Sequence, residues 1–413
     1  MLDIKDNHLI IDDVDTVELS EQFGTPLYVT DKTKLKDNFQ AYRSAFPKAD
    51  IYYAAKANWD LTILKILAEE GAGADVFSEG ELYIATLAKI QTDKILFNGN
   101  SKTDSEIEFA IKSGVKISVD SLDELNTISK VAVKNDCEAN IAFRINPDVS
   151  PDTHPKISTG LKTSKFGILE NEVMDAYKKA CDLPNVNPIG IHCHIGSQIL
   201  DISVYEEATL KMMDIAQKVS SFVELKFIDL GGGLGINYKK EEKIPTPKDL
   251  ADIILPIFEE QTESIGIYPK LILEPGRSIV GDTTILLSRV NTVKKAYKNF
   301  VGIDAGFNLL MRPVMYDSYH EVIVANKADE KVEDTYTIAG PICESGDIIG
   351  SDRKLPKIEK GDLIAVLDTG AYGFSMSSQY NGRPRCAEVV VCKGKANLVR
   401  DKETVKDLVA KFN

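Results

Sequence analysis

Lys56 is the first of several reactive side chains that directly follow apolar runs in this 413-residue sequence. It comes after residues 51–55, a segment of apolar and aromatic residues that predicts a buried strand. Burial at a strand end lowers the pKa of a lysine, so its amine becomes a nucleophile toward carbonyl groups. The alternative is a lysine whose stem lies along the rim of the fold, and Lys56 taken alone favours that alternative.

Two later segments suit an anion and a pyridine ring. Gly231, Gly232 and Gly233 follow residues 225–230, and glycines let backbone N–H groups approach a phosphate closely. The run has the wrong position and spacing for a dinucleotide fingerprint, and a plain tight turn is the alternative. Glu274 opens a Glu-Pro-Gly-Arg sequence. A carboxylate there can keep a pyridine nitrogen protonated, and a simple Glu–Arg ion pair is the alternative.

A histidine pair and a loop cysteine complete the set of candidates. His192 and His194 have the spacing that places two imidazoles on one face of a strand. Zinc is the rival interpretation, but the five histidines of the chain offer no third ligand cluster, so we expect no metal and an imidazole lying against an aromatic ring. Cys343 can donate a proton as a thiol. Its acidic neighbours Glu344 and Asp347 argue against a deeply buried, merely apolar cysteine.

Eight strand-like runs must position these residues. Short apolar segments alternate with amphipathic, helix-like stretches over residues 51–55, 74–77, 94–97, 116–119, 140–145, 189–194, 225–230 and 270–274. A count of eight predicts an α/β fold of the (β/α)₈ barrel type, and a doubly wound sheet is the rival. Polar residues gather at the ends of these runs, where barrel enzymes build their sites.

The pattern changes after about residue 280. Strand-like runs separated by turns then follow at residues 284–290, 300–303, 321–325, 335–339, 363–367 and 387–391. They predict a second, mainly β domain of sandwich or barrel type. We expect the barrel to span residues 31–280 and the β domain to combine residues 1–30 with 281–413, because residues 9–11 and 27–29 are also strand-like and can pair with it.

Composition narrows the class of protein. Lys and Arg number 49 against 63 Asp and Glu, a formal net charge of −14, which disfavours binding to nucleic acid. The polar N-terminus is unlike a signal peptide, and no apolar run is long enough to span a membrane. The six cysteines form no Cys-x-x-Cys pair, so a reducing compartment, the cytoplasm, is expected.

Taken in order, these motifs resemble those of the fold-type III pyridoxal phosphate decarboxylases, the family of alanine-racemase-like barrels. The likeness covers nearly the whole chain. The matching segments are residues 52–58, 75–82, 192–198, 231–235 and 274–277, followed by 312–316, 343–347 and 371–373. Small departures occur at Ala55, where a bulkier residue is usual, at Trp59, and in residues 379–383.

The resemblance implies pyridoxal 5'-phosphate held as a Schiff base on Lys56. His194 would stack on the pyridine ring and Glu274 would pair with its nitrogen. The implied cofactor contacts are Lys56, Asp75, Arg144, His194, Ser197, Gly231, Gly232, Gly233, Glu274, Gly276, Arg277 and Tyr372. The implied substrate contacts are Arg277, Arg312, Tyr316, Glu344 and Tyr372, and the implied catalytic residues are Lys56, His194, Glu274 and Cys343.

Within this family the motifs resemble those of members that convert meso-2,6-diaminopimelate to L-lysine and carbon dioxide. Arg277, Arg312 and Tyr316 would hold the distal carboxylate, and Glu344 the distal ammonium. Arginine suits a carboxylate because its guanidinium forks. Cys343 would donate the proton, and it would come with Glu344 from the partner subunit of a homodimer.

Three alternatives stay open. The first is a related decarboxylase acting on ornithine, arginine, carboxynorspermidine or a carrier-bound glutamyl group. The second is an amino-acid racemase, for which Tyr316 or Tyr372 only loosely fills the role of the base. The third is a non-catalytic regulatory homologue, which the intact Lys56, Glu274 and Cys343 disfavour.

Overall fold

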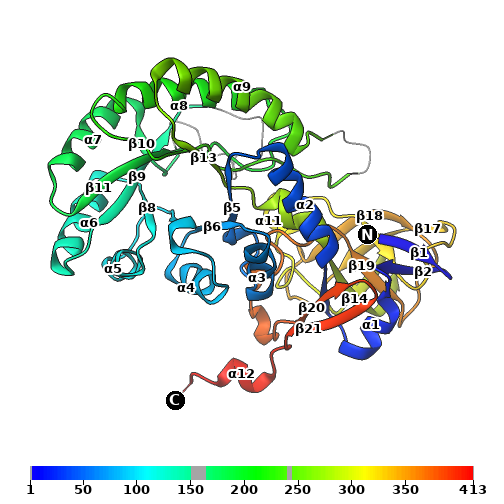
Figure 1. Cartoon of the computed structure of the whole chain (residues 1–413). Helices are drawn as coiled ribbons and strands as arrows, with labels where there is room; N and C mark the ends of the chain where they lie inside the picture. The colour runs from blue at the N-terminus through cyan, green and yellow to red at the C-terminus, as the bar shows by residue number, and fades with distance from the viewer. Residues whose placement is uncertain (1, 150–163, 240–243, 413) are drawn as a thin grey trace. The chain divides into compact units, whose positions relative to one another are not determined.

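A computed structural model describes residues 2–149, 164–239 and 244–412 (Figure 1). The chain forms two compact units. The barrel unit comprises Phe39–Ile236 and Ile244–Ser278, and the second unit comprises Met1–Asn38, Asn237–Lys243 and Ile279–Asn413. The division predicted at residues 31 and 280 concerns functional domains and stays a prediction.

Eight parallel strands close into a ring in the barrel unit. They are β5 (Asp50–Ala54), β6 (Gly73–Val76), β7 (Ile95–Phe97), β8 (Lys116–Val119), β9 (Ala139–Asn146), β11 (Val186–His192), β12 (Phe227–Asp229) and β13 (Lys270–Leu273). Each strand pairs with the next, and β13 pairs with β5, so the sheet has no free edge. A two-residue strand, β10 (Ile168–Leu169), adds to β9. The predicted (β/α)₈ barrel is confirmed, with all eight strands near their predicted positions.

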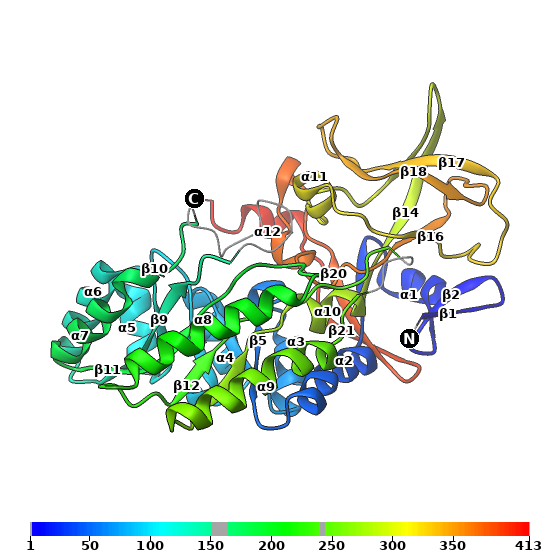
Figure 2. The same ribbon diagram turned by 90° about the horizontal axis from the view of Figure 1, so that it is seen from above.

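Helices cover the outer side of these strands (Figures 1 and 2). They are α3 (Leu61–Glu69), α4 (Glu79–Leu87), α5 (Asp104–Ser113), α6 (Leu122–Lys134), α7 (Val173–Asp182), α8 (Ser203–Val219) and α9 (Pro247–Ile265); α2 (Lys32–Ala45) crosses the border between the units. Several begin at side-chain caps. At α5, the Thr103 hydroxyl accepts from Glu106 N–H at 3.3 Å and the Glu106 carboxylate accepts from Thr103 N–H at 2.9 Å.

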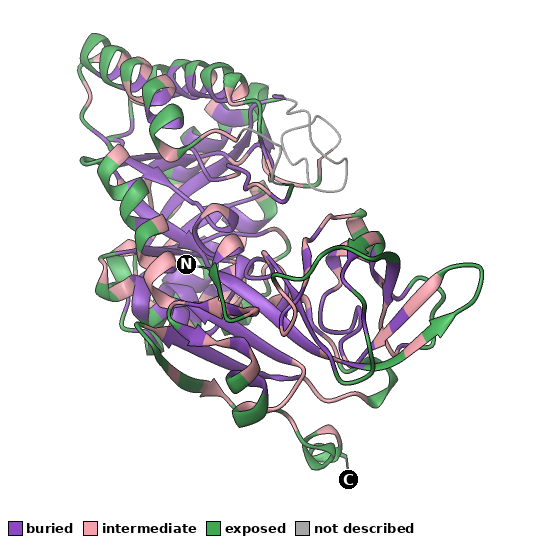
Figure 3. Ribbon diagram, turned by 90° about the vertical axis from the view of Figure 1, so that its right-hand side faces the viewer, coloured by how far each residue is buried: buried purple, intermediate pink, exposed green. Residues whose placement is uncertain are grey.

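Aromatic rings fill the barrel interior. Tyr52 and Phe227 pack there with smaller apolar side chains. Glycines on neighbouring strands make room for the rings, because a Cβ on Gly73 would lie 2.3 Å from the Tyr52 ring and one on Gly190 would lie 2.4 Å from that of Phe227. Figure 3 shows the strands mainly in the colour of buried residues, with exposed positions on the outer helix faces. Because these rings pack the interior of the barrel, the polar groups lie at the carboxyl ends of the strands.

The second unit is mainly β, as predicted. Its large sheet contains β4 (Leu27–Asp31), β14 (Thr284–Lys295), β15 (Asn299–Ile303), β16 (Val322–Val324), β17 (Asp334–Ala339), β18 (Ile348–Leu355), β19 (Leu363–Val366), β20 (Ala387–Cys392) and β21 (Lys395–Arg400). Strand β4 lies between β14 and β20, which confirms that the N-terminal segment pairs with the β domain.

A small sheet of β1 (Leu2–Lys5), β2 (His8–Ile11) and β3 (Val14–Asp15) belongs to the same unit. The short helices α1 (Thr16–Phe23), α10 (Arg277–Val280), α11 (Arg312–Tyr316) and α12 (Val405–Val409) complete the described secondary structure of the chain, apart from one-turn 3₁₀ helices. Among the described helices, none combines the length and apolar character needed to cross a membrane.

Candidate active site

Lys56 lies in a 3₁₀ turn, Ala55–Ala57, directly after β5. Its ammonium donates to Asp75, a fully buried carboxylate on β6, and lies 4.9 Å from the centre of the Phe77 ring. Burial raises the pKa of Asp75, and the nearby Glu274 raises it further, whereas Lys56 lowers it. The amine is therefore held at a defined place beside a carboxylate whose charge depends on it.

Asn98 joins two carboxylates at the centre of the barrel mouth. It follows β7, and its Nδ2 donates to Asp75 Oδ1 and to Glu274 Oε1, both at 2.6 Å. All three side chains are buried. One amide thus links the acid beside Lys56 to the acid after β13, so these groups belong to a single hydrogen-bonded cluster.

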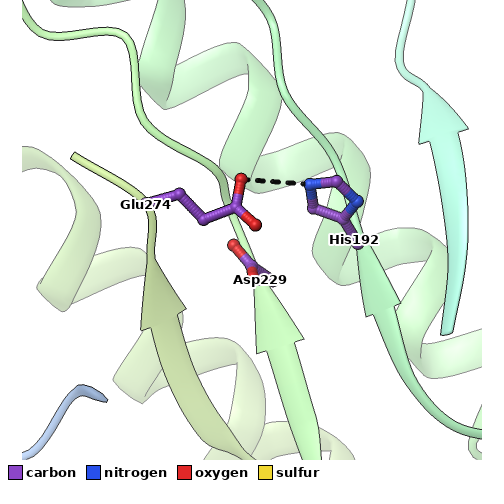
Figure 4. A group of neighbouring side chains, drawn as sticks. All are labelled: His192, Asp229 and Glu274. Carbon is purple, nitrogen blue, oxygen red and sulfur yellow. Dashed lines mark ion pairs between the residues drawn. The ribbon is translucent and has the colours of Figure 1, made fainter. Parts of the chain in front are cut away.

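The other oxygen of Glu274 faces a histidine (Figure 4). Glu274 Oε2 lies 3.4 Å from His192 Nε2, and His192 Nδ1 lies 2.8 Å from Ser118 Oγ. Asp229, on the neighbouring strand β12, points toward the same place (Figure 4). When Ser118 donates to Nδ1, the imidazole carries its proton on Nε2, toward Glu274.

Charge in this cluster is distributed unevenly. Burial tends to raise the pKa of Glu274, but the nearby His192 and Lys56 hold it well below the usual range. Burial and the charge of Glu274 raise the pKa of Asp229. Glu274 therefore stays ionised while Asp229 favours its neutral form.

The same cluster has a composition that can hold a metal. One ligand atom from each of His192, Asp229 and Glu274 lies within 4.8 Å of the others. This set differs from the His192 and His194 pair weighed from the sequence. An imidazole and two carboxylates suit several divalent metals. In the described structure Glu274 is engaged by Asn98 and His192, and Asp229 accepts from the Gly231 N–H, so we assign the cluster to control of the Glu274 charge.

His194 contacts the glycine run. Strand β11 ends at His192, two residues earlier than predicted, so the two histidines have different surroundings. Gly232 N–H donates to His194 Nδ1 at 3.2 Å, and Gly231 N–H donates to Asp229 Oδ1 at 2.8 Å. Burial, with Lys56 and Arg144 nearby, holds the pKa of His194 well below its ordinary value. A neutral imidazole suits a ring that stacks on another ring.

The glycine run has no room for side chains. A Cβ on Gly232 would lie 2.0 Å from the carbonyl oxygen of Glu274. Gly233 has a φ of +116°, and a Cβ there would lie 2.5 Å from the Gly196 carbonyl oxygen. In the described structure the N–H groups of Gly231 and Gly232 already have protein acceptors, so Gly233 offers the available backbone donor of the three.

The remaining barrel candidates lie around this loop. Arg277 Nη2 donates to Ser197 Oγ at 3.0 Å, which ties the end of β13 to the segment after β11. Gly276 packs against the turn of Lys56, because a Cβ there would meet Ala57 Cβ at 3.1 Å. Arg144 is buried, and its guanidinium lies 4.4 Å from the centre of the Phe166 ring.

The Arg312 guanidinium, in the second unit, is held in place by a histidine and a tyrosine. Arg312 is buried at the start of α11, with Nη1 2.8 Å from His320 Nε2 and its guanidinium 4.4 Å from the centre of the Tyr238 ring. Because a guanidinium only donates, His320 accepts on Nε2 and donates through Nδ1 to the Leu367 carbonyl at 2.8 Å. Tyr316, partly buried, ends the same helix.

Cys343 and Glu344 are exposed in a loop between β17 and β18. The predicted exposure of the cysteine is confirmed, but it had been argued partly from Asp347 being at the surface, and that part was wrong. Asp347 is buried, because its carboxylate accepts N–H bonds from Phe307 and Ile342, both at 2.7 Å. Tyr372, partly buried, adopts a left-handed φ of 58°.

Sequence reasoning missed the residues that support these groups. His192 was considered only as a metal ligand, and Asp229 and His320 were not identified. Asn98 was noted only as a polar residue at a strand end. For Asp229 a signal was present, since it is an acid at the end of an apolar strand, two residues before the glycine run.

Comparisons with known proteins define the class. The family model described as "Pyridoxal-dependent decarboxylase, pyridoxal binding domain" matches residues 32–281. The chain therefore belongs to the class of pyridoxal-dependent carboxy-lyases. More narrowly, the chain belongs to the diaminopimelate decarboxylase family.

Relatives over the full length support that assignment. The diaminopimelate decarboxylase of Archaeoglobus fulgidus is 57% identical, over 100% of this chain and 98% of its own length. The crystal structure of the M. jannaschii diaminopimelate decarboxylase with L-lysine has a TM-score of 0.95 at 45% identity and covers 100% of this chain and 98% of that one. The Helicobacter pylori enzyme with L-lysine has a TM-score of 0.90 at 39% identity, covering 95% and 98%.

Pyridoxal phosphate is thus the cofactor, and the barrel residues fit it. An amine at Lys56 suits its aldehyde, and the ionised Glu274 suits a protonated ring nitrogen. The glycine run, which no Cβ can enter, gives a phosphate close access to the backbone.

Proposed function

We propose that this chain converts meso-2,6-diaminopimelate to L-lysine and carbon dioxide. The observation that carries the proposal is the buried cluster in which Asp75 and Asn98 connect Lys56 to an ionised Glu274. A decarboxylase needs both an amine for the cofactor and a fixed negative charge for its ring nitrogen. When bound, pyridoxal phosphate supplies a ring that accepts the electron pair left on carbon as carbon dioxide departs.

Barrel residues would hold the cofactor. Lys56 would bind it covalently and release it when the substrate amine arrives. His194 would lie against the ring, and Glu274 would keep the proton on the ring nitrogen. Ser197 and the glycine run would bind the phosphate. The remaining proposed cofactor contacts are Asp75, Arg144, Gly276, Arg277 and Tyr372.

Residues of the second unit would select the substrate. Arg312 is oriented by His320 and Tyr238, and such a fixed guanidinium binds a carboxylate with two parallel hydrogen bonds. Tyr316, and Arg277 of the barrel unit, would assist it, and Glu344 would bind the distal ammonium. Binding of the distal head orients the reacting head, which lowers the entropic part of the barrier. Cys343 would then donate a proton to the carbon that lost its carboxylate.

A homodimer with shared active sites is part of the proposal. It is supported by the exposure of Cys343 and Glu344, and by an apolar cavity of about 640 Å³ beside Glu344 that Phe307, Met311, Val314 and Tyr380 help to line. Such a surface is suited to contact with a partner subunit. Cytoplasmic location is proposed as well, because a reducing compartment keeps Cys343 a thiol.

Carbon dioxide release from meso-diaminopimelate tests the function. We expect release by the wild type and by the Lys65→Ala control, whose lysine is exposed on α3, but not by Lys56→Ala. Borohydride reduction and peptide mapping should place the cofactor on Lys56. Fast turnover of ornithine with none of diaminopimelate would contradict the substrate assignment. Exchange of the α-proton without carbon dioxide release would indicate a racemase instead.

A further inference from the structure

The loop of Cys343 is held by a second segment that the proposed mechanism does not use. This segment is the turn Tyr380–Gly382, which belongs to the part of the sequence that departs from the family pattern. Asn381 Oδ1 accepts from Cys343 N–H at 3.0 Å, and Asn381 Nδ2 donates to Cys343 Sγ at 3.1 Å. One side-chain amide therefore grips both the backbone and the sulfur of the cysteine.

Tyr380 connects the same cysteine to Glu344. Its hydroxyl donates to Glu344 Oε1 at 2.8 Å and lies 3.9 Å from Cys343 Sγ. Its ring stacks on Phe307, with centroids 5.7 Å apart and planes inclined by 23°. The ring stack holds the hydroxyl in place, so Tyr380 connects the Cys343 thiol to the Glu344 carboxylate.

The hydrogen bonds allow one consistent order of donors, from Asn381 to Cys343, from Cys343 to Tyr380 and from Tyr380 to Glu344. Because Asn381 donates to the sulfur, the sulfur acts there as an acceptor, and its S–H points elsewhere. Because the Tyr380 hydroxyl donates to Glu344, its oxygen can accept from that S–H. After the thiol gives up its proton, the Asn381 N–H remains to stabilise the thiolate.

We propose that Asn381 is a positioning residue that fixes the Cys343 thiol as a proton donor, and that Tyr380 couples it to the ammonium-binding Glu344. This inference rests on the proposed roles of Cys343 and Glu344. In the step concerned, the bond from carbon to the departing carboxylate breaks and its electron pair stays on carbon. That pair takes the proton of the thiol, and the thiolate regains a proton from solvent.

Two variants of Asn381 separate its functions. Its φ of 57° is left-handed, so Asn381→Gly removes the side chain without backbone strain. Asn381→Asp keeps an oxygen for Cys343 N–H but loses the donor to sulfur. Lys393→Gly is the matched control, because Lys393 is exposed in the same unit with a φ of 48°.

We call the two hydrogen bonds between Asn381 and Cys343 the clamp. The rate at which iodoacetamide alkylates Cys343 in the holoenzyme, measured by peptide mapping, tests the clamp directly. We expect Cys343 in Asn381→Asp to react about tenfold more slowly than in the wild type, because the thiolate loses a charge-assisted hydrogen bond. Cys181, exposed on α7, is the internal reference and should react at an unchanged rate. An unchanged rate at Cys343 would overturn the clamp, whether or not the protein decarboxylates any substrate.

Turnover in deuterium oxide tests whether Asn381 positions the Cys343 thiol, because the configuration of the deuterium in the product shows from which side the proton is delivered. Wild type and Lys393→Gly should place deuterium in one configuration at the lysine carbon that lost its carboxylate, whereas both Asn381 variants should give a mixture. Tyr380→Phe should raise KM for the substrate several-fold with a smaller change in kcat. If Cys343→Ala keeps a single configuration, the proposed role of Cys343 fails. If Cys343→Ala gives a mixture and the Asn381 variants do not, only the positioning role fails.

Discussion

Oε2 of Glu274 lies 3.4 Å from Nε2 of His192, and both side chains are almost completely buried. Glu274 is thus held from two sides, since Asn98 donates to its other oxygen. An unpaired carboxylate at this depth would take up a proton, because burial favours the neutral form. His192 and Asn98 therefore help to keep the negative charge that we propose Glu274 offers to the cofactor ring, without contacting the reacting atoms themselves.

Replacing His192 tests this dependence. His192→Leu should lower kcat by about 10²-fold, because it removes a preorganised partner of the charge at Glu274. His192→Gln, whose amide can still donate, should retain more of the activity. Both should be compared with Glu274→Gln, which removes the charge itself and should cost at least as much. Equal kcat in His192→Leu and wild type would contradict the role given to the pair.

Glu81 should make stability depend on pH. Burial raises its pKa to about 7, against the lowering effects of the Phe77 N–H and Lys56. A raised pKa in the folded state stabilises the protein fully below the unfolded value of about 4.3, and this stabilisation is lost as the pH rises through 7. At about 1.4 kcal/mol per pKa unit, a rise from about 4.3 to about 7 contributes on the order of 3–4 kcal/mol.

Melting of Glu81→Gln measures that contribution. The variant is neutral at every pH, so the Tm of the wild type should fall relative to that of Glu81→Gln between pH 5 and pH 8. Glu259→Gln, at an exposed position on α9, is the control and should follow the wild type. A constant difference in Tm across this range would show that Glu81 does not titrate there.

Arg312→Lys should raise KM for meso-diaminopimelate by roughly 10–100-fold with a smaller change in kcat. Lysine keeps the charge but cannot form the two parallel hydrogen bonds of a guanidinium or stack on Tyr238 in the same way. Steady-state kinetics give both constants. Arg43→Lys, exposed on α2, provides the matched control and should leave KM unchanged. A fall in kcat alone would place Arg312 outside substrate recognition.

Gly233→Ala should weaken cofactor retention, measured by absorbance after dialysis, and lower Tm. The new Cβ would lie 2.5 Å from the Gly196 carbonyl oxygen in addition to occupying a positive φ. Gly114→Ala isolates the second effect, since Gly114 has a φ of +69° with open space around it, and should cost only about 1 kcal/mol. Similar losses in the two variants would mean that the loop has more room than its contacts suggest.

The barrel could be predicted because most residues of its strands are buried on both faces, so the strands appear as short apolar runs between polar ends. The same logic located Lys56 and Glu274. In the second unit, β18 and β21 were missed for an identifiable reason. They are the edge strands of the large sheet, and residues 351–354 and 395–400 carry charges that suit an edge but obscure the strand pattern.

The supporting cluster could not be predicted because it depends on register. His192 pairs with Asp229 across β11 and β12, and Glu274 joins them from the end of β13. Nothing in the spacing of these three residues along the chain indicates that their side chains meet. The clamp of Asn381 on Cys343 is similar, since its two parts are 38 positions apart in loops of the second unit.

The placement of β4 bears on how the chain matures as it leaves the ribosome. Thr30 of β4 pairs with Thr284 of β14, 254 positions later, and the other neighbour of β4 is β20, which is synthesised later still. All eight barrel strands are synthesised after β4 and before β14. The barrel can therefore close during translation, before the partner strands of β4, which are β14 and β20, have been synthesised.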